Sequence, residues 1–381
     1  MNTDNLTTPA TYFPNLNGLR FVTAFAIMII HIEHVKFLFH RDVIELVHHY
    51  GYIGPQLVSI FFVLSGFLIT YLLLKEKKKT GTINFKFFYT RRLLRIWPLY
   101  YLVILVGFFI LPHVDSFFGN NITFSYNNFW WHLGLYMLFL PALNNISRAI
   151  SATWSVRVEE IFYFFWPIII KKTANYIKVF LAIIIGVIAL RGIVGVGLHI
   201  TQSVFIRKIF NLIVLYRISC MAIGGLGAYL LYSENKRVLT LLFRKDLQVA
   251  VYIVTLLGWF YNPNIPFISF EVYSMLYLII ILNLALNPAT ILKLNYKWMD
   301  YLGKTSYGIY LYNPILRIIC LEVIERCYGH IIIGWQMNLL LYAGTIASTL
   351  LISILSFELF ESKFLRLKSK YSVAQKAVLS T

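Results

Sequence analysis

Long apolar runs separated by short polar or charged stretches dominate the chain. A bilayer core of about 30 Å requires about 20 mainly apolar residues per helix. Ten runs approach that length, with approximate limits 18–39, 52–74, 93–112, 152–170, 176–198, 209–231, 248–261, 267–287, 305–326 and 331–357. The seventh run is short and the last is long. The pattern predicts an all-α, polytopic transmembrane helix bundle of about ten spans.

The charged residues between these runs predict the topology. Most of the 34 Lys and Arg residues lie in alternate loops and in the C-terminal tail. Cytoplasmic loops of membrane proteins carry the excess of positive charge, so both termini are expected to face the cytoplasm. Residues 130–143 are apolar but too few to span, and a crossing there would reverse every later loop. We therefore interpret this stretch as interfacial or re-entrant.

The composition excludes several other classes of protein. Hydrophobic residues make up 59% and charged residues 13%, against about 45–50% and about 25% in soluble domains. A formal net charge of +18 would suit nucleic acid, but the charges cluster between apolar runs instead of covering a polar surface. We predict a cytoplasmic segment at 1–15, one transmembrane domain at 16–361 and a basic cytoplasmic tail at 362–381.

Two polar residues in the first predicted span suggest chemistry. His31 follows Arg20 by eleven residues, which in a helix places both side chains on one face about 16 Å apart. Buried neutral imidazole can accept a proton from a hydroxyl, so His31 is a candidate general base that Glu33 or a nearby carboxylate could tune or orient. The alternative is a hydrogen-bonded core histidine. His34 follows at i+3, but no further ligand has metal spacing, so we predict no metal site.

An arginine cluster lies at the predicted cytoplasmic entry to the third span, in the stretch FYTRRLLRIWPLYY. Arg91 and Arg95 are i and i+4 and therefore neighbours on one helix face, with Arg92 beside them. Basic residues at this boundary can simply set topology or contact lipid headgroups. The functional alternative is recognition of an anionic, phosphate-bearing donor, which guanidinium groups suit.

The stretch TWSVRVEEIFYFFW begins the fourth predicted span. Arg157 and Glu160 have the spacing of an i,i+3 ion pair, which leaves Glu159 as the candidate catalytic acid. An acidic first turn favoured by the helix dipole is the alternative. Further charged residues fall inside other spans and could pair among themselves in ways that the sequence does not specify: Arg191, Arg217, Glu271, Arg317 and Glu322.

Taken together, five stretches resemble the acyltransferase family 3 of integral membrane proteins across nearly all of 15–365. They are LNGLRFVTAFAIMIIH, VSIFFVLSGFLIT, YTRRLLRIWPLYY, TWSVRVEEIFYFFWP and GKTSYGIYLYNP, in that order. The family's pattern of Arg or Lys followed by His falls on Arg20 and His31. Its arginine-rich and WSxxxE motifs fall on Arg91, Arg92, Arg95, Trp154, Ser155 and Glu159.

The resemblance implies an O-acyltransferase of the bacterial inner membrane. Such an enzyme moves an acyl group, usually acetyl from acetyl-CoA, to a sugar hydroxyl of a surface polysaccharide or its lipid-linked precursor, for example lipopolysaccharide O-antigen. His31 would act as the base or carry the acyl group, Arg20 would stabilise donor phosphate or developing charge, and the arginine cluster would hold coenzyme A. Trp154, Ser155 and Tyr307 would contact substrate, although Tyr307 also suits a packing role. Acyl-CoA would be a substrate and not a bound cofactor, and the other expected partners are the glycan and membrane lipids.

The chain departs from the family at Asn313, where relatives often have His, and at 361–363, where Pro is missing from a terminal acidic element. A rival interpretation is a secondary transporter or flippase with Arg20, His31 and Glu271 as an ion relay. That class predicts paired half-sequences with broken helices, which the sequence does not show. A structural or partner-binding membrane protein is the third interpretation.

Overall fold

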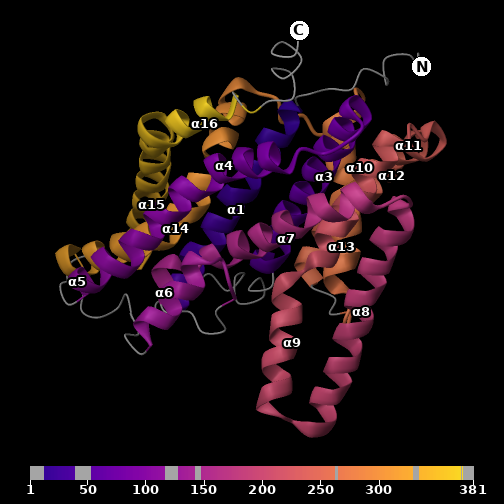
Figure 1. Ribbon diagram of the computed structural model, residues 1–381. Coiled ribbons are helices and arrows are strands. Elements are labelled where there is room, and N and C mark those ends of the chain that lie inside the picture. The colour runs from indigo at the N-terminus through magenta and orange to yellow at the C-terminus, as the bar shows by residue number, and fades with distance from the viewer. Residues whose placement is uncertain are drawn as a thin grey trace. The chain divides into compact units, whose positions relative to one another are not determined.

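The computed structural model describes residues 13–38, 53–115, 128–141, 147–261, 265–328, 334–369 and 371. The predicted terminal segments 1–15 and 362–381 lie largely outside these residues. In the described part every regular element is a helix (Figure 1). The predicted all-α class is therefore confirmed.

The helices follow one another along the chain with short connections. In order they are α1 (Pro14–Leu38), α3 (Ile53–Thr80), α4 (Phe85–Leu105), η2 (Val106–Ile110), α5 (Leu111–Asp115), α6 (Phe129–Met137), η3 (Arg148–Ile150), α7 (Thr153–Lys172), α8 (Tyr176–Thr201), α9 (Val204–Tyr216), α10 (Ile218–Tyr232), α11 (Lys236–Leu242), α12 (Lys245–Tyr261), α13 (Ser269–Leu286), α14 (Lys297–Tyr328), α15 (Gly334–Ser356), η4 (Phe357–Glu361) and α16 (Ser362–Ser369). Here η2 and η4 are π-helical turns that continue α4 and α15, and η3 is a 3₁₀ turn.

Eight helical segments of the described chain are long and apolar enough to cross a membrane: Pro14–Phe37, Ile53–Thr80, Phe85–His113, Tyr176–Thr201, Val204–Tyr232, Ser269–Leu286, Lys297–Tyr328 and Gly334–Leu367. A polytopic bundle is thus confirmed. The other two expected spans are present as helices, but α7 carries three charged residues in its first half, and α12 has only 17 residues. At 1.5 Å per residue α12 is about 25 Å long, short of the bilayer core. The orientation of the termini stays a prediction.

The chain forms two compact units. Unit 1 comprises Met1–Thr23, Tyr52–Ile83 and Phe165–Lys304, and unit 2 comprises Ala24–Gly51, Asn84–Phe164 and Thr305–Thr381. Helices α1, α7 and α14 each contribute residues to both units.

Unit 1 is built on the close packing of α3 against α10. A Cβ added at Gly66 would lie 2.0 Å from the carbonyl oxygen of Met221, and one at Gly224 would lie 2.1 Å from that of Val63. Only glycine allows the two backbones to approach this closely, as is usual where membrane helices pack. Helices α8 and α13 complete the packing around α10.

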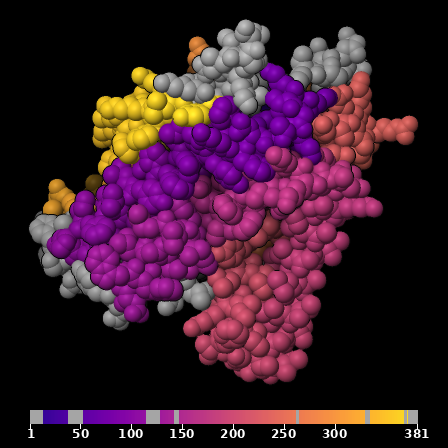
Figure 2. Space-filling model, in the orientation of Figure 1, coloured from indigo at the N-terminus to yellow at the C-terminus, as the bar shows by residue number. Residues whose placement is uncertain are grey.

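Helices α8 and α9 of unit 1 lie side by side (Figure 1), and their side chains are drawn in pink in Figure 2. Large apolar side chains on them, such as Ile185, Ile193 and Phe205, are exposed. Exposed apolar side chains on long helices are expected where lipid tails, and not water, surround the protein.

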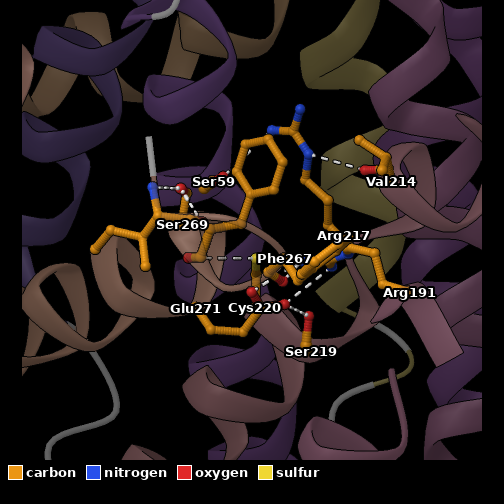
Figure 3. Close-up of polar contacts among 11 residues, drawn as sticks. Ser59, Arg191, Val214, Arg217, Ser219, Cys220, Phe267, Ser269 and Glu271 are labelled. Atoms are coloured by element: carbon orange, nitrogen blue, oxygen red, sulfur yellow. Dashed lines mark hydrogen bonds and ion pairs between the residues drawn. The ribbon is translucent and has the colours of Figure 1, made fainter. Parts of the chain in front are cut away.

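A cluster of charged side chains lies inside unit 1 (Figure 3). Arg191 on α8 donates two hydrogen bonds of 3.0 Å to the two carboxylate oxygens of Glu271 on α13. Arg191 is 3% exposed and Glu271 is 5% exposed. Ser219 on α10 donates a third hydrogen bond, of 2.6 Å, to Glu271 Oε1. The ion pair therefore joins three helices in an environment where an unpaired charge would be costly.

Arg217 marks a break between α9 and α10 within one predicted span. Its backbone is left-handed, with φ of 42°. Its guanidinium group lies 3.8 Å from the ring centre of Phe270 and donates to the carbonyl oxygen of Pro55 over 2.6 Å. Its Nε donates to the carbonyl oxygen of Val214 at the end of α9 over 3.3 Å. Arg217 thus bonds to backbone acceptors of both α9 and α3, which the sequence did not predict.

Unit 2 contains the helices that carry the other sequence motifs, α4, the first half of α7, and most of α1 and α14. Tyr100 on α4 donates to the carbonyl oxygen of Tyr136 on α6 over 2.8 Å. Helix α6 has nine residues, too few to cross a membrane, and its Trp130 and Trp131 are 76% and 68% exposed. Exposed indoles are typical of the membrane interface, so α6 fits the predicted interfacial stretch.

Candidate functional site

The part of α14 that belongs to unit 2 forms hydrogen bonds to three other helices that carry sequence motifs. Toward α4, the hydroxyl of Tyr307 donates to the carbonyl oxygen of Ile96 over 3.0 Å. Toward α7, the hydroxyl of Tyr310 shares a hydrogen bond of 2.8 Å with Ser155 Oγ. Ser155, selected from the WSxxxE motif, is therefore held by α14, and the hydroxyl of Tyr307 is engaged by backbone.

Toward α1, α14 contacts His31 at two points. Asn313 Oδ1 lies 3.3 Å from His31 Nδ1. Arg317 Nη1 donates to the carbonyl oxygen of His31 over 2.7 Å. The ring and the backbone of His31 are thus both held by one turn of α14.

The residues of α14 that make these contacts lie at i, i+3, i+6 and i+10. At 100° and 1.5 Å per residue they occupy a sector of about 120° over about 15 Å of helix. They are Tyr307, Tyr310, Asn313 and Arg317. One face of α14 therefore brings elements of α1, α4 and α7 together, which no single motif predicted.

Glu33, which we expected to orient His31, has other partners. Lys36 Nζ donates to both of its oxygens over 2.9 and 3.1 Å, and Tyr342 on α15 donates to Oε1 over 2.5 Å. Glu33 and Lys36 are both fully buried. The side chain that contacts the imidazole is Asn313, a residue that sequence analysis noted only as a departure from the family.

The arginine cluster of α4 is surrounded by aromatic rings. Arg91 donates to the carbonyl oxygen of Tyr371 over 2.8 Å. The guanidinium of Arg92 lies between two rings, 5.8 Å from the centre of Phe88 and 5.7 Å from that of Tyr163. Aromatic faces attract guanidinium groups and fix their plane. Arg92 is therefore held in a defined orientation.

Two carboxylates accompany these arginines. Glu160 on α7 accepts a hydrogen bond of 3.0 Å from Trp97 Nε1 and interacts electrostatically with Arg92. Glu361 of η4 interacts in the same way with Arg95. The cluster thus combines three guanidinium groups with two carboxylates, and it retains positive charge for an anionic ligand.

The predicted ion pair between Arg157 and Glu160 does not form. Arg157 Nη1 donates instead to the carbonyl oxygen of Leu140 over 2.9 Å, with its guanidinium 4.1 Å from the ring centre of Tyr136. Because the competing acceptor lies outside α7, the i,i+3 spacing alone could not reveal it.

Glu159, the predicted catalytic acid, accepts a hydrogen bond of 2.7 Å from Tyr163 on the same helix. The i,i+4 spacing of these two residues was a signal available in the sequence. Trp154 is half-buried at the start of α7. Sequence analysis assigned Glu160 to Arg157 and missed its hydrogen bond from Trp97 and its electrostatic interaction with Arg92.

Arg20 belongs to unit 1, although α1 is continuous from Arg20 to His31. Its Nη1 donates to Asn17 Oδ1 over 2.9 Å, and Asn17 Nδ2 donates to Asp300 Oδ1 over 2.8 Å. Asp300 also pairs with Lys304 at 2.7 Å. Arg20 therefore lies in a polar network of α1 and α14 that includes the charged side chains of Asp300 and Lys304.

Comparison with known proteins identifies the family model that fits the chain. The model of the acyltransferase domain of acyltransferase family 3 matches residues 13–358. This match covers every motif described above and confirms the resemblance seen in the sequence. No solved structure matches the chain.

Named relatives share 26% identity with the chain. The peptidoglycan O-acetyltransferase OatA of Listeria monocytogenes aligns over 375 residues, 92% of this chain and 55% of the relative. A putative O-acetyltransferase of Staphylococcus aureus aligns over 93% of this chain and 57% of its own length. The putative peptidoglycan O-acetyltransferase YrhL of Bacillus subtilis aligns over 83% and 52%. The chain therefore spans about half the length of these relatives.

Proposed function

Since the chain belongs to acyltransferase family 3, we propose that it transfers an acetyl group from acetyl-CoA to a hydroxyl of a cell-surface glycan. The chain is a membrane acyltransferase. Our proposal concerns the donor, the acceptor and the roles of individual residues. The observation that carries these roles is the pair of contacts from α14 to His31, by Asn313 and by Arg317.

For the acceptor we propose a peptidoglycan glycan strand or its lipid-linked precursor. Two relatives are named as peptidoglycan O-acetyltransferases or putative ones, whereas none of those compared is named for lipopolysaccharide. We therefore propose peptidoglycan in place of the expected O-antigen, and we include lipopolysaccharide in the test as the competing acceptor. Because the chain matches about half of each relative, the activity of the whole relatives is part of the proposal.

His31 is the proposed general base. The acceptor O–H proton passes to the imidazole while the oxygen bonds to the acyl carbon. The carbon–sulfur bond of the thioester then breaks, and the departing thiolate takes the proton to give free coenzyme A. A base of this kind contributes about 10²–10⁴ to the rate. In the alternative chemistry His31 itself carries the acetyl group before the hydroxyl attacks.

The arginines are the proposed binding site of the donor. Acetyl-CoA carries several phosphate charges, and guanidinium groups recognise phosphate oxygens in pairs. Arg92 is pre-oriented between two rings, which reduces the conformational entropy lost on binding. Arg91 and Arg95 supply further positive charge. For Arg20, which belongs to unit 1, we separately propose stabilisation of donor phosphate or developing charge. Glu159, Trp154 and Ser155 are proposed to contact the acceptor, with Glu159 as the second acid.

We place the protein in the bacterial cytoplasmic membrane, with the arginine cluster on the cytoplasmic side. The excess of Lys and Arg in alternate loops supports this orientation. It exposes the donor site to the compartment that contains acetyl-CoA. The glycan then reaches His31 from the opposite side or along the bilayer.

Transfer of labelled acetyl from acetyl-CoA tests the proposal directly. The purified full chain in lipid nanodiscs is incubated with labelled acetyl-CoA and with either peptidoglycan fragments, lipid-linked precursor or lipopolysaccharide. We expect acceptor-dependent ester label that alkali releases, on a peptidoglycan-type acceptor. Label on lipopolysaccharide alone would overturn the proposed acceptor. Substrate-dependent flux in liposomes without any label transfer would contradict the enzyme reaction and favour transport.

A further inference from the structure

We propose that Asn313 is a catalytic residue of the transfer reaction. Its amide oxygen selects the tautomer of His31, and its amide nitrogen donates to the carbonyl oxygen of the acyl group under attack. This inference rests on the proposed function of His31 as the base.

The contact between the two side chains determines which ring nitrogen is basic. Asn313 Oδ1 lies 3.3 Å from His31 Nδ1. An amide oxygen can only accept, so this hydrogen bond forms when the proton of the neutral imidazole is on Nδ1. The lone pair is then on Nε2, the nitrogen that can take a proton from a hydroxyl. The same logic explains how a hydrogen-bonded partner orients the histidine of catalytic triads.

The amide nitrogen of Asn313 carries the second half of the inference. Asn313 is 1% exposed, and no described residue accepts a hydrogen bond from its Nδ2. One turn further along α14, Arg317 is 3% exposed and its Nε is likewise without an acceptor in the described chain. Buried donors in folded proteins nearly always have a partner. The free amide nitrogen beside the candidate base is therefore available to a group that arrives with the substrate.

The chemistry of acyl transfer supplies that group. When the hydroxyl oxygen attacks the acyl carbon, the electron pair of the C=O bond moves to the carbonyl oxygen, which becomes negative. Pre-oriented donors that stabilise this oxygen are a large term in such reactions. The negative charge returns to reform the carbonyl as the carbon–sulfur bond breaks. Asn313 Nδ2 is the proposed donor to this oxygen, and Arg317 supplies a positive charge one turn further along α14.

An amide suits both tasks at once. It accepts through Oδ1 and donates through Nδ2 without titrating, whereas a second imidazole at this position would change charge near neutral pH. In this chain the ionisable side chain of His31 is hydrogen-bonded to the neutral side chain of Asn313. Arg317 adds a fixed positive charge and holds the backbone of His31 at 2.7 Å.

Two substitutions separate the two tasks. Asn313→Leu removes both the acceptor and the donor, while Asn313→Asp keeps acceptor oxygens for His31 Nδ1 and brings negative charge where the oxyanion develops. We expect kcat for acetyl transfer to fall by about 10²–10³ in Asn313→Asp and further in Asn313→Leu, with little change in the KM for acetyl-CoA. Tyr312→Phe is the matched control, because it removes the neighbouring hydrogen bond of α14 to Ser356; we expect less than about a twofold change.

The tautomer of His31 can be measured by ¹⁵N NMR, independently of activity. In nanodiscs with ¹⁵N-labelled histidine, the resonances absent from His31→Gln identify His31 among the nine histidines. We expect a protonated Nδ1 in the wild type and in Asn313→Asp, and a mixture of tautomers in Asn313→Leu. A proton on Nε2 in the wild type would overturn the first half of the inference.

The outcomes distinguish this inference from the proposed function. Wild-type kcat in both Asn313 variants, together with loss of transfer in His31→Gln, would overturn the role of Asn313 and leave the function intact. Full activity in His31→Gln would overturn both. If Asn313→Leu does not fold, Asn313→Asp alone decides the role of the amide nitrogen.

Discussion

The indole nitrogen of Trp97 on α4 donates a hydrogen bond of 3.0 Å to Glu160 Oε2 on α7. This bond joins the arginine-rich stretch to the WSxxxE stretch through two residues that sequence analysis did not select as site residues. Glu160 is therefore a carboxylate of α7 that interacts electrostatically with Arg92.

Separate kinetic effects are expected from the two adjacent glutamates. Glu160→Gln removes a negative charge beside Arg92, so it changes the KM for acetyl-CoA and leaves kcat within about threefold. Glu159→Gln lowers kcat, because Glu159 is the proposed second acid. Steady-state transfer kinetics at several acetyl-CoA concentrations measure both. Equal effects of the two substitutions on kcat and KM would contradict this division.

Arg92 should be the most sensitive of the three arginines to a conservative change. Lysine lacks the planar group that lies between the rings of Phe88 and Tyr163. We expect Arg92→Lys to raise the KM for acetyl-CoA about tenfold, the equivalent of one charged hydrogen bond. Lys86→Ala is the control, since Lys86 is exposed on the same helix. An unchanged KM in Arg92→Lys would show that only charge matters there.

The ion pair between Arg191 and Glu271 should stabilise unit 1 without taking part in transfer. Removing one partner leaves a buried charge, which costs about 3–5 kcal/mol. We expect Glu271→Met and Arg191→Met each to lower the melting temperature in nanodiscs. The double variant Arg191→Met with Glu271→Met should recover part of the loss. Additive losses in the double variant would show that the two side chains do not stabilise each other.

The hydrogen bond between Ser155 and Tyr310 should position α7 against α14. Ser155→Ala and Tyr310→Phe each remove the same bond of 2.8 Å, worth about 1 kcal/mol. We therefore expect similar, modest losses of stability and no further loss in the double variant. Thermal unfolding of the three variants checks this. A direct catalytic role for Ser155 would appear instead as a far larger loss of transfer in Ser155→Ala than in Tyr310→Phe.

The sequence predicted the helices well because hydrophobic length alone determines which segments can span a bilayer. It was less informative where a span is interrupted. The 209–231 run gave no sign of the break at Arg217, because the interaction of its guanidinium with the carbonyl oxygen of Pro55 depends on a helix far away in the chain. The sequence of α7 also resembled a span. Three charged residues in its first half make the helix too polar to count among the eight candidate spans.

Within the candidate site, the sequence identified residues but not their partners. Motif spacing selected His31, Ser155 and the arginines. Local spacing rules also predicted an ion pair of Arg157 with Glu160 that does not form, since a backbone carbonyl outside the helix competes successfully. Asn313 drew attention only as a departure from the family. Its contact with His31 joins residues 282 positions apart, and no local pattern encodes such a contact.

The central claim is that His31 is the group on which acetyl transfer depends. The most direct measurement is the initial rate of label transfer by His31→Gln, compared in the same nanodiscs with the wild type and with His34→Gln, which alters an exposed histidine of the same helix. We predict a loss of at least about 100-fold in His31→Gln and a rate within about twofold of the wild type in His34→Gln. A His31→Gln protein that transfers acetyl at the wild-type rate would contradict the account.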